Sequence, residues 1–156
     1  KRLRANVDLF FRMLDTATPN ACLVVMGSNP DCYVSHPKVF YTGTLRHEQC
    51  LQIYRNADCM FHLAYADHCP NTVVEALSQG CPVVCSNIGG TKELVGDFGV
   101  IVDEGEFQFE PFDHDAPPTI DVSKIELREY NGLGKHADID INNVASQYVK
   151  LAGEIA

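Results

Sequence analysis

The sequence contains no apolar run close to about 18 residues, so we expect none of its 156 residues to form a transmembrane segment. Positive charge is also scarce, because 12 Lys and Arg stand against 21 Asp and Glu. The formal net charge of −9 argues against broad binding to DNA or RNA, although a local basic patch could still bind a phosphate. The basic first residues lead into no long apolar run or small-residue cleavage site, so we expect no signal peptide.

The cysteines lack the spacing of a zinc site. Cys81 and Cys85 have three residues between them, and no second pair at zinc-finger spacing follows. They and Cys22 and Cys59 lie in or beside strand-like apolar runs, where a free cysteine behaves as a small hydrophobic residue. We therefore expect reduced thiols, no metal site and a cytoplasmic location, with peripheral contact at a membrane left open.

Short apolar runs alternate with segments of helical periodicity. This alternation predicts an α/β fold, a Rossmann-like parallel sheet with helices on both faces, in which ligands bind at the carboxyl ends of the strands. The loops that we expect at that edge are 27–30, 43–46, 65–71 and 86–91. The expected strands are 22–27, 39–43, 59–65, 82–86 and 99–103, and the first of them is expected to be fully buried. The expected helices are 6–14, 46–57, 71–80 and 91–96.

We interpret residues 1–156 as one domain, a length that suits a single sizeable core. A sheet of this type usually opens with a strand, yet Lys1 stands just before a helix, so the first strand is expected to be missing. Residues 104–124 are acidic and contain Pro, and we expect an irregular excursion there. Helical spacing returns in 138–156 and predicts a C-terminal helix.

Asp67 and Glu75 flank the start of the helix predicted at 71–80, and two interpretations of them are open. In the structural one, Thr72 and Glu75 form a capping box, Asn71 serves as an alternative N-cap, and Asp67 is a solvated loop acid. In the functional one, the free amides of the helix N-terminus bind phosphate or sugar oxygens. The two carboxylates then accept hydrogen bonds from ligand hydroxyls.

The stretch "DHCPNTVVEALSQGCPVVCSNIGG" (67–90) carries a resemblance to a known family. It contains two acids separated by seven residues, a Pro-Asn loop, a Glu-Ala-Leu helix, a Gly-x-Pro-Val-Val strand and a Gly-Gly turn. This pattern resembles the C-terminal, donor-binding half of retaining glycosyltransferases with the GT-B architecture, the family 4-like group. The resemblance covers about residues 20–103 in order, and "DINNVASQYVKL" is similar to the family's returning helix.

The resemblance implies a role for each residue of the expected site. Glu75 would hold the ribose hydroxyls of a nucleoside diphosphate, and Asp67 would contact the donor sugar, which makes these two the expected catalytic residues. Asp67 departs from the family, whose first acid is usually Glu. The expected donor-binding residues are Gly27, Gly43, Thr44, Leu45, His68, Cys69, Pro70, Asn71, Thr72 and Glu75.

The diphosphate requires positive charge, for which the family uses an Arg and a Lys near its first helix. Lys1, Arg2 and Arg4 are the candidates here, and the sequence does not choose between them. His62, in the middle of a predicted strand, is expected to be a core histidine with its hydrogen bonds satisfied.

The reaction implied is transfer of a hexose from a nucleotide diphosphate sugar, with a UDP-sugar favoured, to an acceptor hydroxyl with retention of configuration. No further cofactor is expected. The expected partners are the nucleotide sugar, an acceptor glycan, lipid or protein, and an N-terminal GT-B domain outside this chain, without which the chain would catalyse little. The alternatives are a nucleotide-sugar epimerase of the same architecture and a non-catalytic nucleotide-binding or interaction module.

Overall fold

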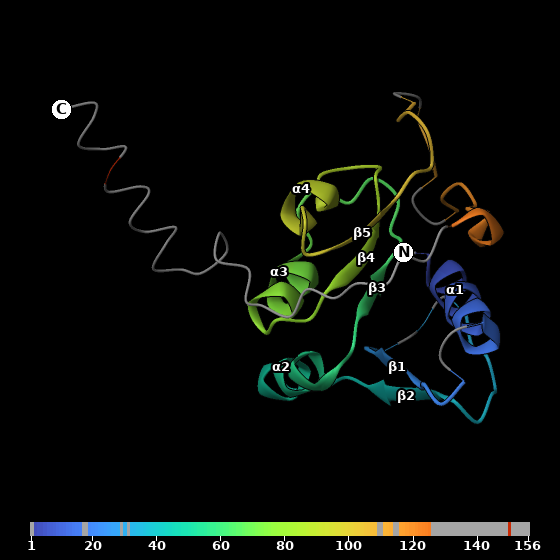
Figure 1. Ribbon diagram of the computed structural model, residues 1–156, viewed down its shortest axis with the longest axis vertical. Coiled ribbons are helices and arrows are strands. Elements are labelled where there is room, and N and C mark those ends of the chain that lie inside the picture. The colour runs from blue at the N-terminus through green and yellow to red at the C-terminus, as the bar shows by residue number, and fades with distance from the viewer. Residues whose placement is uncertain are drawn as a thin grey trace.

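A computed structural model describes residues 2–16, 19–28, 30, 32–108, 111–113, 116–125 and 150. Helices and parallel strands alternate along most of this part of the chain, as Figure 1 shows. The elements are α1 (Leu3–Thr16), β1 (Leu23–Met26), β2 (Val39–Gly43), α2 (His47–Asn56), β3 (Met60–His62), α3 (Asn71–Ser78), β4 (Val83–Ser86), α4 (Thr91–Val95), β5 (Gly99–Val102) and the 3-10 helix η1 (Val122–Lys124).

The described strands form two small sheets, in which β1 pairs with β2 and β4 lies between β3 and β5. All three strand pairs are parallel, with Leu23 opposite Val39 and Met60 opposite Val83. The α/β class is therefore confirmed, but the strands do not form the single sheet that we expected, because β1 and β3 are not hydrogen-bonded to each other. Phe61 of β3 still packs against the apolar cluster around Val25, so the two sheets share core contacts.

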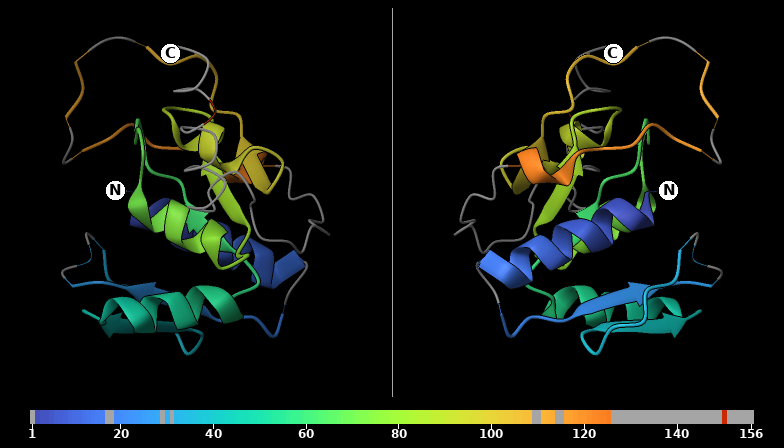
Figure 2. Two further views of the ribbon diagram at one scale, coloured as in Figure 1. Left: turned by 90° about the vertical axis from the view of Figure 1, so that its left-hand side faces the viewer. Right: turned by 90° about the vertical axis from the view of Figure 1, so that its right-hand side faces the viewer.

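Helices cover both faces of the β3–β4–β5 sheet, because alternate residues of a strand point to opposite faces. Val83 and Cys85 pack in a cluster with residues of α2, α3 and α4. Val84 and Val102 instead share a cluster with Leu9 of α1. Figures 1 and 2 show α1 on the opposite side of these strands from α2 and α3, which confirms the expected layering.

Three expectations from the sequence need correction. The strand predicted at 59–65 stops at His62, because the next backbone N–H, that of Leu63, donates to the Asn6 side chain (3.1 Å) instead of a neighbouring strand. The strand predicted at 22–27 was expected to be fully buried, but Val24 is 38% exposed. Cys22, which we took for a small hydrophobic residue, is exposed, whereas Cys81 and Cys85 are buried as expected.

The chain after β5 packs back onto the core. Ile125 is buried in the cluster that contains Leu9 and Leu63, and Arg12 donates to the carbonyl oxygens of Val122 and Ile125. The helix predicted at 138–156 lies outside the described residues, except for Lys150. Among the described residues, no helix is both long enough and apolar enough to cross a membrane.

Candidate functional site

The turns after β1 and β2 lie side by side at the carboxyl edge of the first sheet. Gly27 donates its N–H to the carbonyl oxygen of Gly43 (3.0 Å). Both glycines have positive φ, +107° and +66°, which other residues adopt only with strain. No atom lies within 4 Å of a Cβ built on either glycine, so the turn has open space beside it. Thr44 and Leu45 continue from this turn toward α2.

The N-terminus of α3 is built differently from what either capping interpretation predicted. Pro70 is the N-cap residue, and its carbonyl oxygen accepts from the amides of Val73 (3.0 Å) and Val74 (3.3 Å). No side chain caps the helix, so both the Thr72–Glu75 capping box and the Asn71 cap were wrong. The amides of Asn71 and Thr72 have no partner in the described part of the chain. These free donors make the helix start able to bind an anion.

Glu75 points toward the N-terminus of α2 and not back toward its own helix start. Its Oε1 lies 3.3 Å from Nε2 of His47, and its side chain is 29% exposed. Because His47 follows the turn at 43–45 by two residues, this contact places Glu75 close to that turn. His47 was not among the site residues expected from the sequence. Its position in the first turn of the predicted helix 46–57, just after a strand, is the one feature of the sequence that points to it.

Asp67 is held in place by contacts on both its side chain and its backbone. Its Oδ2 lies 3.2 Å from Nε2 of His62, whose side chain is only 7% exposed, which confirms His62 as a core histidine with a polar partner. The Asp67 carbonyl oxygen accepts from the amide of Gly90 (3.1 Å) and from the Thr91 hydroxyl (3.2 Å). The Asp67 side chain remains 31% exposed, and within the described residues no hydrogen bond to its Oδ1 is found.

The Gly-Gly turn after β4 allows the loop around Asp67 to approach closely. A Cβ on Gly89 would lie 2.6 Å from the Asp67 carbonyl oxygen, and one on Gly90 would lie 2.2 Å from that of His68. Both distances are far below van der Waals contact, so side chains at these positions would push the loop away. The glycines therefore set the position of Asp67 and His68 relative to β4.

Two pockets flank this loop and share Ala66 and His68. The smaller, of about 290 Å³, is lined by Tyr65, Asp67, Cys69 and residues of the chain after β5. The larger, of about 590 Å³, lies between the loop, the Gly-Gly turn and Phe107, with Lys92 at its margin. Glu75 lines neither pocket.

Residues 2–109 match the family described as group 1 glycosyl transferases. The chain belongs to this family. It is also similar to the O-antigen chain mannosyltransferase B of Escherichia coli, with 32% identity over 66 residues. That stretch is 42% of this chain and 17% of the relative, so the chain corresponds to a small part of the relative's length.

For this group 1 glycosyltransferase domain, the family match and the α/β fold confirm the resemblance to the C-terminal domain of a GT-B enzyme. The match includes both acids and every donor-binding residue expected from the sequence. The structure places the two acids in different surroundings. Glu75 lies by the 43–45 turn, and Asp67 lies by the pocket at 64–69, with the free amides of α3 between the two acids in sequence.

The three basic candidates for the diphosphate differ in their surroundings. Lys1 lies outside the described residues. Arg4 is exposed and forms an ion pair with Asp8 one helical turn later (3.0 Å). Arg2 is 6% exposed, and its Nη1 donates to both carboxylate oxygens of Glu104 at 2.7 and 2.8 Å. The other two guanidinium nitrogens of Arg2, Nε and Nη2, are buried and have no hydrogen-bond partner among the described residues.

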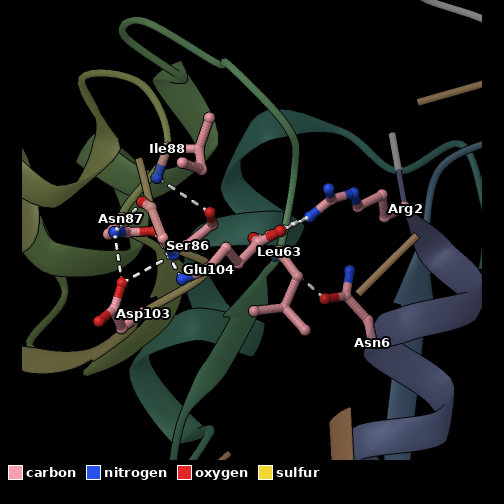
Figure 3. Close-up of polar contacts among 9 residues, drawn as sticks. Arg2, Asn6, Leu63, Ser86, Asn87, Ile88, Asp103 and Glu104 are labelled. Atoms are coloured by element: carbon pink, nitrogen blue, oxygen red, sulfur yellow. Dashed lines mark hydrogen bonds and ion pairs between the residues drawn. The ribbon is translucent and has the colours of Figure 1, made fainter. Parts of the chain in front are cut away.

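A polar network holds Glu104 in position for Arg2. The Asn87 side chain accepts from the amide of Glu104 (2.9 Å) and donates to Asp103 (2.9 Å) and to the carbonyl oxygen of Gly105 (3.0 Å). Figure 3 shows Asn87 beside Asp103, with Glu104 reaching across to Arg2 at the start of α1. The network therefore ties the end of β4, the turn after β5 and α1 together around the loop that carries Asp67.

Proposed function

We propose that this chain is the donor-binding domain of a retaining glycosyltransferase, which transfers a hexose from a nucleotide diphosphate sugar to an acceptor hydroxyl. The observation that supports this most directly is the start of α3. Two free amides there, of Asn71 and Thr72, lie in sequence between two half-buried carboxylates, Asp67 and Glu75. Carboxylates accept hydrogen bonds from hydroxyls, and a helix N-terminus favours negative charge.

Each part of the donor then has a chemically suitable partner. The Glu75 carboxylate accepts hydrogen bonds from the ribose hydroxyls beside the turn at 43–45, and that turn borders the base. The amides at the start of α3 donate hydrogen bonds to the diphosphate oxygens, and the Asp67 carboxylate accepts hydrogen bonds from sugar hydroxyls. As the sugar leaves, negative charge grows on the diphosphate, and preorganised amides stabilise that charge without a further cofactor or metal ion.

The acceptor is a hydroxyl of a glycan, lipid or protein, and a second domain completes the reaction centre. The family match supports glycosyl transfer as the reaction class. The retained configuration, the hexose and the preference for uridine belong to this proposal and follow from the resemblance of the motif at 67–90.

Substituting Glu75→Ala tests the donor site. We expect loss of nucleoside diphosphate binding, measured by calorimetric titration with uridine, guanosine and adenosine diphosphates, with the melting temperature little changed, because Glu75 caps no helix. Glu48→Ala is the matched control, since it removes an exposed acid from the first turn of α2 beside His47. That control is expected to bind normally.

Unchanged nucleotide affinity in the Glu75→Ala variant would contradict the proposed site. So would equal losses in the Glu75→Ala and Glu48→Ala variants, because these would indicate a general effect of negative charge. If the unmodified chain binds none of the three nucleotides, a donor-binding function is refuted and the non-catalytic alternative is favoured.

A further inference from the structure

The smaller pocket has one wall that the family match does not include. The match ends at residue 109, yet Phe112 and Pro117 line the pocket together with Tyr65, Asp67 and His68. The chain after β5 therefore returns to the loop that carries Asp67 and lines part of the pocket. Because this wall lies outside the matched residues, it is suited to determine specificity and not the common chemistry.

The Tyr65 ring is fixed from several directions. Its centroid lies 4.9 Å from that of Phe112, with the two rings at 87°, and 5.9 Å from that of Phe107. The Arg2 guanidinium carbon lies 4.9 Å from the Tyr65 centroid, a cation–π distance, and Arg2 is itself held by Glu104. Tyr65 and Phe112, which we call the aromatic corner, thus form two perpendicular walls of the pocket.

Polar groups also line this pocket. Asp67 Oδ2 is paired with His62, which leaves Oδ1 as an acceptor, and the exposed His68 also lines the pocket. An apolar aromatic wall and a carboxylate in one pocket suit a pyranose, which has an apolar C–H face and a rim of hydroxyls. The volume of about 290 Å³ is at the low end for small-ligand pockets, which suits a single sugar ring better than a whole nucleotide sugar.

We propose that the aromatic corner binds the hexose ring of the donor and that Phe112 is a specificity-determining residue for that sugar. The inference rests on the proposed donor-binding function and extends it to a sugar subsite. The C–H face of the ring packs on the aromatic corner while Asp67 Oδ1 accepts a hydroxyl. The nucleotide portion is bound elsewhere, near Glu75, so it makes no contact with Phe112.

The test compares donors with and without their sugar. The affinities of the full chain for UDP, UDP-glucose, GDP and GDP-mannose are measured by calorimetry for the unmodified protein and for Phe112→Ala. We expect Phe112→Ala to weaken binding of the preferred nucleotide sugar about three- to tenfold, which is the size of one lost aromatic contact. The affinity for the matching nucleoside diphosphate should not change. Phe40→Ala is the matched control, because Phe40 is 52% exposed on β2 and lines neither pocket.

A second pair of variants keeps the test decisive if Phe112→Ala does not fold. Phe112→Leu retains apolar bulk without an aromatic face, so it should weaken binding of the nucleotide sugar but not of the nucleoside diphosphate. The sequence contains no tryptophan, so Phe112→Trp adds a single fluorescent reporter to the pocket. Its emission should change with the nucleotide sugar and not with the nucleoside diphosphate.

The outcomes separate the two proposals. The sugar subsite would be overturned if the Phe112 variants bound the nucleotide sugar as tightly as the unmodified chain does. It would also be overturned if they lost equal affinity for the nucleotide sugar and for the nucleoside diphosphate. Either result would leave the donor function intact. Absence of binding to all four compounds by the unmodified chain would overturn the donor function, and the sugar subsite with it.

Discussion

The two sheets of this domain are built from similar strands, but they are covered very differently. All four residues of β4 are buried, because α1 packs on one face of its sheet and α2, α3 and α4 pack on the other. In β1 only Val25 is buried, and the register neighbours Val24 and Phe40 are exposed on one face. The loop that carries Asp67 is pinned to the fully covered sheet.

The connection from β1 to β2 explains the difference. Parallel strands usually require a crossover helix, but the described residues of 27–38 contain none. This connection lies on the side of α1, where the His36 ring is 4.9 Å from that of Phe11 and the Tyr33 ring stacks on Tyr41 at 4.5 Å. The opposite face of β1 and β2 is therefore left with apolar residues in solvent.

The largest predicted effect concerns the ion pair that ties α1 to the covered sheet. Arg2→Ala is expected to lower the free energy of unfolding by about 3–5 kcal/mol, because it leaves the Glu104 carboxylate, only 9% exposed, without its partner. Denaturant unfolding measures this loss. Arg4→Ala is the control, because its ion pair with Asp8 is exposed and should contribute about 0.5 kcal/mol or less.

Replacing both members of the pair separates a charge effect from a packing effect. The double variant Arg2→Met, Glu104→Gln should recover most of the stability lost in Arg2→Ala, because no unpaired buried charge remains. A cost for Arg2→Ala as small as that for Arg4→Ala would show that the pair does not anchor α1.

The second prediction compares the two sheets by apolar truncation. Leu77→Ala, in the buried cluster of α3 and β4, should lower the free energy of unfolding by about 2–5 kcal/mol. Phe40→Ala removes a larger side chain from β2, yet should cost about 1 kcal/mol or less, since that side chain is half in solvent. Both values come from denaturant titrations, and equal costs would contradict the difference in coverage.

The smallest effect near neutral pH is a pH dependence of the covered sheet, which becomes large only in alkaline solution. Burial raises the pKa of Cys85 to about 12, and burial together with nearby Cys59 and Asp58 raises the pKa of Cys81 to about 12. Both groups would ionise near 9.0 when unfolded. Their contribution to stability is complete below pH 9 and is lost between about pH 9 and 12, at up to roughly 1.4 kcal/mol per pH unit for each thiol.

Thermal and denaturant unfolding at pH 8, 9 and 10 under reducing conditions would measure this loss. Cys85→Ala should make the dependence shallower, whereas Cys22→Ala in the exposed approach to β1 should leave it unchanged. An identical pH profile for Cys85→Ala and the unmodified chain would contradict the assignment.

Much of the framework could be predicted from local pattern. The period of the apolar residues located all five strands and the first four helices within a few residues, since burial on a helix or strand face repeats along the chain. The spacing of Asp67 and Glu75 and the Gly-Gly turn identified the family. The capping of α3 was mispredicted, because Thr72 and Glu75 fit a capping box but Pro70 occupies the N-cap position.

The sequence by itself determined the α/β class, the family and the loops that follow the strands, because each depends on short-range periodicity and on motifs of neighbouring residues. Only the tertiary structure decided which distant groups meet there. His47 approaches Glu75, Arg2 pairs with Glu104, and Phe112 forms the aromatic corner with Tyr65. These contacts join residues that lie 28, 102 and 47 positions apart in the sequence. Such contacts depend on how the whole chain packs, so the local periodicity of the sequence cannot predict them.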